Sequence, residues 1–214
     1  MDNKVLITGA SKGLGYYLAH YFFKKGYSLV LHGRDLKRLN KLKGELNSKD
    51  RDIEIFNCEL NDETEITKLA SFACRKNVKI LINNAGMICP GKSLENLSND
   101  EINMMINTNL KAPILLSKYL LSNLSDIINI NSMIGLEPRE KRTLYSASKF
   151  GLRGFSESLK LESKDLNILD VYPTNIKTWK ERKNAMDVEE VIEKIYQSFI
   201  SKEKKLIIDG RKSN

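Results

Sequence analysis

The alternation of short apolar runs with helix-length segments constrains the fold of this chain most. Runs such as Val5-Leu6-Ile7 and Ile80-Leu81-Ile82 are continuously apolar and are bounded by turn-forming residues. Strands that helices cover on both faces have this character, because neither face meets water. The predicted strands are residues 4–8, 28–32, 52–58, 79–83, 126–131, 168–172 and 205–209.

The segments between these strands carry apolar residues at helical spacing. The predicted helices are residues 14–25, 35–47, 62–76, 98–123, 145–161 and 187–201. A strand–helix alternation of this kind predicts a doubly wound α/β fold, with a parallel seven-stranded sheet and helices on both faces. With 214 residues, four prolines and no linker-like stretch, residues 1–214 are expected to form a single domain.

Composition excludes several classes of protein. No run approaches the roughly 20 apolar residues of a membrane span, and Met1 leads almost directly into the first strand, so we expect a cytoplasmic protein without a membrane segment. The net charge is +8, but the lysines are scattered, which argues against nucleic-acid binding. Cys58, Cys74 and Cys89 lack metal-ligand spacing and are expected to be reduced thiols, so no metal site is predicted. Cys89 falls in a loop and stays open as a site residue.

A glycine-rich turn follows the first predicted strand. It reads Gly9-Ala10-Ser11-Lys12-Gly13-Leu14-Gly15 and leads directly into the first predicted helix. Glycine lets the backbone turn tightly and approach a phosphate closely, and the N-terminus of the helix favours negative charge. The spacing departs from the common G-x-G-x-x-G pattern. Its place after the first strand nevertheless favours dinucleotide binding over a simple chain reversal.

The end of the second predicted strand bears on the choice between NADP and NAD. A residue at this place reads the adenosine ribose in dinucleotide-binding folds. Gly33 supplies no carboxylate, whereas Arg34 and Lys12 are able to pair with a 2′-phosphate. Asp35 is the competing signal for NAD, and we interpret it as the cap of the next helix. His32 is given no role. The sequence predicts NADP(H), with NAD(H) as the alternative.

Five short motifs in order resemble those of the classical short-chain dehydrogenase/reductase family. They are T-G-A-S-K-G-L-G at 8–15, N-N-A-G at 83–86, T-N-L at 108–110, N-S-M-I-G at 131–135 and Y-S-A-S-K at 145–149. Each motif alone is weak evidence for the family, but five motifs at the right points of one βαβ series are specific for it. The resemblance implies an NAD(P)-dependent oxidoreductase that interconverts a carbonyl compound and an alcohol by hydride transfer.

The resemblance also implies four catalytic residues. Tyr145 is the expected acid/base, Ser132 the hydroxyl that holds the substrate carbonyl, and Asn109 a residue that helps to hold a water next to Lys149. Tyr145 and Lys149 are four residues apart on a predicted helix and share a face. An ammonium near a phenol is expected to lower the pKa of Tyr145 from the ordinary value of about 10. Asn107 is the alternative to Asn109.

The cofactor contacts expected from the glycine turn and the resemblance follow the carboxyl ends of the strands. They are Gly9, Ser11, Lys12, Gly13, Leu14, Gly15, Arg34, Glu59, Leu60, Asn84, Ala85, Gly86, Tyr145, Lys149, Pro173, Ile176 and Thr178.

The segment after the sixth predicted strand departs from the family pattern. Thr174 follows Pro173 where relatives usually carry glycine, and threonine resists positive φ, so a displaced loop is expected. The stretch after Thr178 is short, which predicts a shallow, open substrate site. Trp179 in this stretch is expected to anchor the loop or to cover the nicotinamide.

The other wall of the substrate site is expected from residues 87–89 and 133–144. The second stretch contains Arg139, Lys141 and Arg142, which hint at an anionic substrate. Surface lysine and arginine are common, so the hint is weak.

A dinucleotide-binding sensor with little catalytic activity is the alternative, but a sensor has no need of Ser132, Tyr145 and Lys149. An epimerase or dehydratase of the wider family usually has a longer C-terminal region. The expected substrate is a small carbonyl compound or alcohol. By analogy with the family, a homodimer or homotetramer is expected, formed through the faces of helices 98–123 and 145–161.

Overall fold

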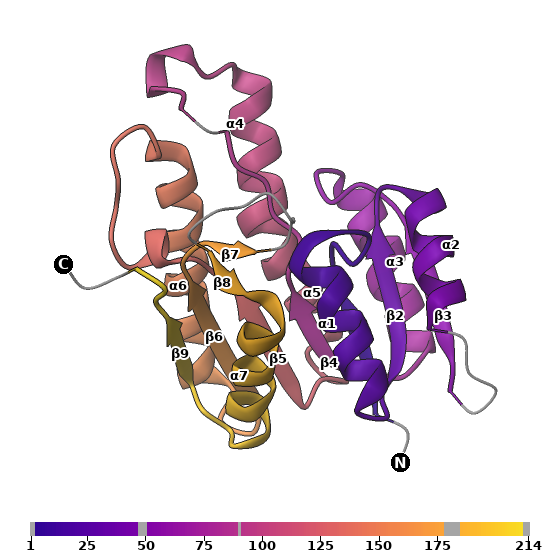
Figure 1. Cartoon of the computed structure of the whole chain (residues 1–214). Helices are drawn as coiled ribbons and strands as arrows, with labels where there is room; N and C mark the ends of the chain where they lie inside the picture. The colour runs from indigo at the N-terminus through magenta and orange to yellow at the C-terminus, as the bar shows by residue number, and fades with distance from the viewer. Residues whose placement is uncertain (1–2, 47–50, 90, 178–184, 212–214) are drawn as a thin grey trace.

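A single parallel sheet organises the computed structural model, which describes residues 3–46, 51–89, 91–177 and 185–211 (Figure 1). Within these residues the sheet has the seven strands that were predicted, and their order is β3-β2-β1-β4-β5-β6-β9. They are β1 (Lys4–Ile7), β2 (Ser28–Gly33), β3 (Ile53–Asn57), β4 (Val78–Asn83), β5 (Asp126–Ile130), β6 (Asn167–Pro173) and β9 (Lys205–Ile208). The sequence did not predict a small second pair, β7 (Ile176–Lys177) with β8 (Met186–Asp187).

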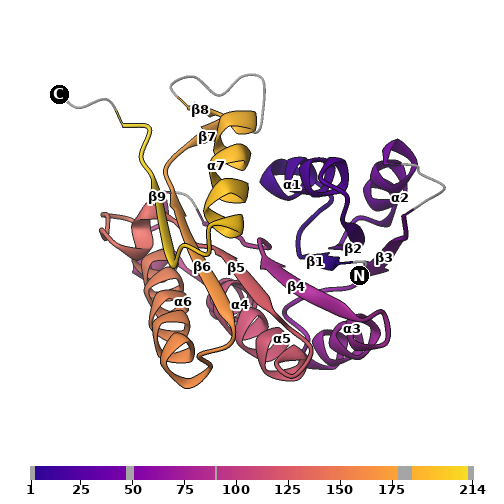
Figure 2. The same cartoon turned by 90° about the horizontal axis from the view of Figure 1, so that it is seen from below.

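Helices cover both faces of the sheet. The α-helices are α1 (Gly13–Lys24), α2 (Leu36–Glu45), α3 (Glu63–Arg75), α4 (Asn99–Ile106), α5 (Ala112–Leu120), α6 (Thr143–Glu162) and α7 (Val188–Ile200), with short 3-10 turns η1 (Leu94–Asn96) and η3 (Met133–Gly135). Figure 2 shows α1, α2 and α7 on one face and α3, α4, α5 and α6 on the other. The predicted doubly wound architecture is confirmed.

The apolar strands supply a core layer on each side of the sheet. Val5 and Ile7 on β1 pack into the layer under α1 and α7, whereas Leu6 between them packs into the layer under α3 and α5. All three side chains are fully buried. Strand side chains alternate between faces, so both faces of β1 have to be apolar.

Short polar side chains begin several helices. Asp35 accepts a hydrogen bond from the Arg38 N–H and caps α2, which confirms the interpretation of Asp35 as a cap. Asp62 and Asp187 cap α3 and α7 in the same way. Ser98 forms a capping box with Glu101 at the start of α4.

The helix predicted over residues 98–123 is found from Asn99 to Leu120, but it is not α-helical throughout. A π-helical segment, η2 (Asn107–Lys111), separates α4 from α5. The Asn109 side chain accepts from the Met87 N–H at 2.8 Å and donates to the Met87 carbonyl at 2.9 Å. These bonds to a distant loop accompany the wider turn, and π-turns occur frequently at functional sites. Apolar spacing alone does not reveal such a turn.

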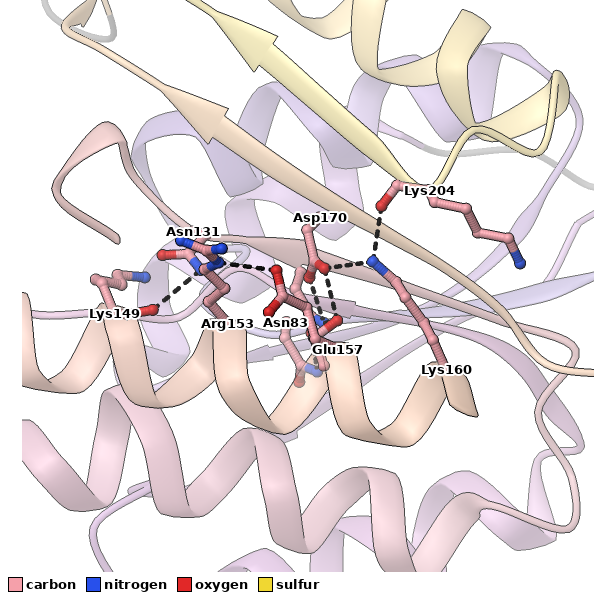
Figure 3. Close-up of polar contacts among 10 residues, drawn as sticks. Asn83, Asn131, Lys149, Arg153, Glu157, Lys160, Asp170 and Lys204 are labelled. Carbon is pink, nitrogen blue, oxygen red and sulfur yellow. Dashed lines mark hydrogen bonds and ion pairs between the residues drawn. The ribbon is translucent and has the colours of Figure 1, made fainter. Parts of the chain in front are cut away.

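A row of buried polar side chains ties α6 to the central strands (Figure 3). Asn83, Asn129 and Asp170 lie in register on β4, β5 and β6. Asn83 donates to Asn129 at 2.9 Å, and Asn129 donates to Asp170 at 3.1 Å. From α6, Ser156 and Lys160 donate to the Asp170 carboxylate at 2.7 and 2.6 Å. The buried Asp170 carboxylate therefore accepts hydrogen bonds from three side chains. Those three donors share it as an acceptor, so its removal affects all of them.

We predict that Asp170→Ala lowers the free energy of unfolding by about 3 kcal/mol, because Lys160, Ser156 and Asn129 lose their common acceptor. Urea denaturation at neutral pH measures the change. Asp165→Ala removes an exposed carboxylate from the turn between α6 and β6 and serves as the matched control. Equal losses in the two variants would contradict a specific role for the buried row.

Candidate active site

The glycine loop packs against the segment that follows β4. Gly9 has φ +67°, and a Cβ at this position would lie 2.9 Å from the Ala85 Cα. A Cβ at Gly15 would lie 2.3 Å from the Gly9 carbonyl oxygen and 2.5 Å from Asn84 Nδ2. Neither position has room for a side chain. Other atoms of the same loop line a cavity, which is where a pyrophosphate is expected to bind.

Thr8 and Asn84 fasten these two segments together. The Thr8 hydroxyl accepts from the N–H groups of Asn84 and Ala85, both at 3.0 Å. The Asn84 amide donates to the carbonyls of Thr8 and Gly9 at 2.8 and 3.2 Å. These four hydrogen bonds join the carboxyl ends of β1 and β4, and the Thr8 N–H and hydroxyl both donate to the Ile82 carbonyl as well.

His32 supports the same loop, a role that the sequence analysis missed. The Gly9 N–H donates to His32 Nδ1 at 3.3 Å, and His32 Nε2 lies 3.2 Å from the Cys58 carbonyl oxygen. These partners assign the proton to Nε2. Burial lowers the pKa of His32 to about 4, so the imidazole is neutral and remains an acceptor for Gly9 near neutral pH.

A cavity of about 650 Å³ opens beside the glycine loop. Lys12, Arg34 and Arg38 supply its basic side chains, of which Arg38 was missed by the sequence analysis. Arg34 lies 3.6 Å from Glu59, and Arg38 lies 3.1 Å from Asp35. The other expected contacts on its wall are Gly9, Ser11, Gly13, Leu14, Glu59, Leu60, Asn84, Ala85 and Gly86.

This cavity fits the adenosine end of a dinucleotide. Its glycine cradle has no room for a Cβ at two positions, and the basic side chains at its wall suit a phosphate. These features were expected from the sequence.

A second cavity of about 560 Å³ adjoins the first, because Leu14, Asn84, Gly86 and Met87 line both. Its wall also contains three of the four expected catalytic residues and two of the expected nicotinamide-side contacts. These are Ser132, Tyr145, Lys149, Pro173 and Ile176. This wall brings together residues from four of the five motifs and from the segment that follows the sixth predicted strand.

The Lys149 side chain is buried near Tyr145, and both residues belong to α6. Lys149 is 4% exposed, and its Nζ donates to the Ile130 carbonyl at 2.9 Å. Nζ also lies 5.8 Å from the centre of the Tyr145 ring. Asn131, which follows β5, donates to the Lys149 backbone carbonyl (Figure 3). Burial lowers the pKa of Lys149 to about 8.

The expected lowering of the Tyr145 pKa is wrong for this structure. Burial raises the pKa of the phenol, and this effect exceeds the opposing effects of the Ser132 hydrogen bond and the Arg142 charge. Desolvation disfavours the charged phenolate, and the Lys149 ammonium donates to Ile130. Tyr145 is therefore protonated near neutral pH.

Asn109 connects η2 to the site. Besides Met87, its amide donates to the Ser148 hydroxyl at 3.1 Å, and Ser148 donates to the Tyr145 carbonyl at 2.8 Å. Asn107 instead donates to the Asn61 carbonyl at 3.3 Å from an exposed position. Asn109, and not Asn107, is the asparagine next to α6. Its role in holding a water stays a prediction.

Thr174 is accommodated without positive φ. Its N–H donates to the Ile208 carbonyl at 3.0 Å, and its hydroxyl accepts from the Gly210 N–H at 2.8 Å. Thr174 thereby fixes the segment after β9 at the cavity. Thr178 and Trp179 lie outside the described residues, and so does most of the short segment from which a shallow site was predicted. Cys89 is not among the residues that line either cavity.

Residues 3–188 match the family model described as short chain dehydrogenase. The chain belongs to the short-chain dehydrogenase family. Among the relatives of this short-chain dehydrogenase is a sulfoacetaldehyde reductase of Chromohalobacter salexigens, 33% identical over 76% of this chain and 67% of the relative. Another is a 3-oxoacyl-acyl-carrier-protein reductase of Rickettsia conorii, 30% identical over 89% of this chain and 80% of the relative.

Solved structures of similar proteins agree with this assignment. The bulky-bulky ketone specific alcohol dehydrogenase from Comamonas testosteroni is 28% identical with a TM-score of 0.89, over 96% of this chain and 85% of that chain. A short-chain dehydrogenase from Sphingobium yanoikuyae in complex with NADPH is 28% identical with a TM-score of 0.85, over 96% of this chain and 87% of that chain. The protein is an oxidoreductase that uses NAD(P), as the motifs implied.

In the part of the chain that the structure describes, none of the helices has the length and apolar character of a membrane span. No group of three or more histidine, cysteine, aspartate or glutamate side chains there is arranged to hold a metal ion.

We predict that the free energy of unfolding falls by about 3 kcal/mol between pH 6.5 and pH 4 through His32. The folded pKa of about 4 lies below the ordinary 6.5, so the unfolded chain binds more protons in this window and stability decreases as pH falls. Urea denaturation across this range, compared with His32→Gln, isolates the contribution. His20→Gln should keep the wild-type dependence. The same acid sensitivity in His32→Gln would contradict the assignment.

Proposed function

We propose that this short-chain dehydrogenase is an NADP-preferring reductase of small ketones or aldehydes, which also runs in reverse as an alcohol dehydrogenase. The observation that carries the proposal is the cavity that Ser132, Tyr145 and Lys149 share, next to the glycine loop. A dinucleotide-binding sensor has no need of this group, and no contact in the structure favours one.

The proposed mechanism assigns one task to each side chain. When bound, NADPH supplies the hydride that the carbonyl carbon receives. The hydroxyls of Ser132 and Tyr145 hold the carbonyl oxygen, and Tyr145 gives its proton to that oxygen, so the product is an alcohol. The nearby Lys149 ammonium stabilises the phenolate left on Tyr145. Asn109 holds Ser148 and Met87, and so keeps the start of α6 in place.

The NADP preference rests on the basic side chains of the first cavity. Lys12, Arg34 and Arg38 outnumber the acidic partners Asp35 and Glu59. The relatives' structures support the preference, since the Sphingobium enzyme was solved with NADPH and a metagenomic short-chain oxidoreductase, 27% identical with a TM-score of 0.81, with NADP. Thr178 is retained as a proposed contact.

The proposal extends to organisation and location. Residues 1–214 are proposed to be one catalytic domain, since one sheet unites strands from both ends of the chain. A homodimer or homotetramer is proposed through α4, α5 and α6. Exposed apolar side chains at Leu121, Phe150 and Leu161 support this surface. A cytoplasmic location is proposed because the three cysteines are free thiols.

Tyr145→Phe tests the reaction. We expect kcat/KM for carbonyl reduction to fall by about 10² to 10⁴-fold, because the proton donor is lost, while the Kd of NADPH stays within about threefold. A carbonyl panel followed by loss of NADPH absorbance, with a direct NADPH titration, measures both. Tyr119→Phe, away from the cavities, should leave both values unchanged. Full activity in Tyr145→Phe would overturn the mechanism.

The cofactor preference has its own test. Arg34→Gln and Arg38→Gln are each expected to raise the Kd of NADPH by about tenfold and to leave the Kd of NADH nearly unchanged, because NADH lacks the 2′-phosphate. Lys37→Gln removes a positive charge at an exposed position of α2, the helix that also contains Arg38. It controls for the general loss of positive charge near the cavity. Equal weakening of both cofactors would contradict the proposed phosphate contact.

A further inference from the structure

The cavity that contains Tyr145 has a strongly basic wall. Apart from Lys149, the charged residues that line it are Arg139, Arg142 and Arg211. No aspartate or glutamate is among the described residues on this wall. The basic residues suited to the cofactor phosphate, Lys12 and Arg34 among them, line the adjoining cavity instead. The three arginines are therefore not needed for the cofactor.

Arg142 lies closest to the chemistry. It occupies the N-cap position of α6, three residues before Tyr145, and is half-buried. Its charge acts on the Tyr145 phenol. Its guanidinium donates to the Cys89 carbonyl at 3.5 Å, and among the described residues it has no carboxylate partner within 4 Å. A half-buried guanidinium without a counter-ion favours an anionic ligand over a neutral one.

Arg211 and Arg139 form the outer part of the same wall. Arg211 is fixed by Glu137 at 2.7 Å and by Asp209 at 2.8 Å. The charge of Arg139 also acts on these two carboxylates, although it forms no ion pair with them among the described contacts. Two carboxylates therefore face two arginines at the rim, and neither carboxylate lines the cavity. Among the described residues, no carboxylate compensates the charge of Arg142, farther inside.

Apolar side chains surround this positive charge. Met87, Ile88, Met133 and Ile134 line the same cavity. Charge pairs are stronger where apolar walls limit water. Positions 142 and 145 are one helical turn apart, about 5 Å along the axis, so one small molecule is able to reach both side chains.

We propose that the substrate is an anionic carbonyl compound, a short ketone or aldehyde with a carboxylate or sulfonate a few bonds from its carbonyl. Arg142 binds the charged end, Arg139 and Arg211 line its path of entry, and the carbonyl lies at Ser132 and Tyr145. This inference rests on the proposed function, because it places a carbonyl at Tyr145.

The test compares two ketones that differ in charge but hardly in shape, 4-oxopentanoate and 4-oxopentanamide. Their binding to the full chain is measured by ligand-observed NMR titration, with and without NADP⁺, which has no hydride to give to a ketone. We expect the carboxylate to bind at least about tenfold more tightly than the amide. Arg142→Gln should abolish most of this difference. Lys141→Gln removes the same charge from the same loop, at an exposed position off the cavity wall, and should preserve it.

The outcomes separate this inference from the proposed reaction. Equal binding of the two ketones, or equal weakening by Lys141→Gln and Arg142→Gln, would overturn the anion site. Arg139→Gln, at the exposed rim, gives a second variant that should weaken the carboxylate by about threefold, and an unchanged affinity there would remove Arg139 from the site. Reduction with NADPH is measured in parallel. Arg142-dependent binding without reduction of either ketone would support the anion site and count against the proposed reaction.

Discussion

The joint between the ends of β1 and β4 is the contact on which both cavities depend. Thr8 and Asn84 are 76 residues apart, yet their side chains share hydrogen bonds with each other's backbone. Gly9 and Gly15 permit this approach because neither position has room for a Cβ. The joint sets the wall between the cavities, since Asn84 lines both. A backbone so closely packed is already arranged for a ligand, which lowers the entropic cost of binding.

The helix α6, which contains Tyr145 and Lys149, is held by polar contacts in its middle and in its first turns. Asp170 and Asn129 hold the middle of α6 through Ser156, and Asn109 holds its first turns through Ser148. Buried polar groups are costly unless every partner is satisfied, and here several donors from α6 meet acceptors on the strands. The result is that Tyr145 belongs to a helix with directional contacts to the sheet, in addition to apolar packing. Directional contacts restrict rotation and sliding of a helix, which catalytic geometry requires.

The local sequence pattern was enough to predict the strands, the glycine turn and the Asp35 cap, because each of these depends on residues that are neighbours in the sequence. It was not enough for the π-helical turn at Asn109, which depends on the Met87 backbone. The support of Gly9 by His32 and the place of Arg211 in the cavity that contains Tyr145 were missed for the same reason. The Tyr145 pKa was misjudged because the sequence shows a neighbouring charge but not the depth of burial, and burial has the larger effect.

The raised pKa of Tyr145 and the lowered pKa of Lys149 have one physical cause and work together. Burial disfavours both charged forms, the phenolate and the ammonium. Near neutral pH the phenol keeps its proton, and with a pKa of about 8 Lys149 is still mostly charged. A protonated phenol is the form that carbonyl reduction consumes, and a nearby ammonium stabilises the phenolate that reduction produces. Oxidation of an alcohol would have to start from the phenolate, which burial makes scarce. Burial therefore keeps on Tyr145, near neutral pH, the proton that the proposed reduction needs.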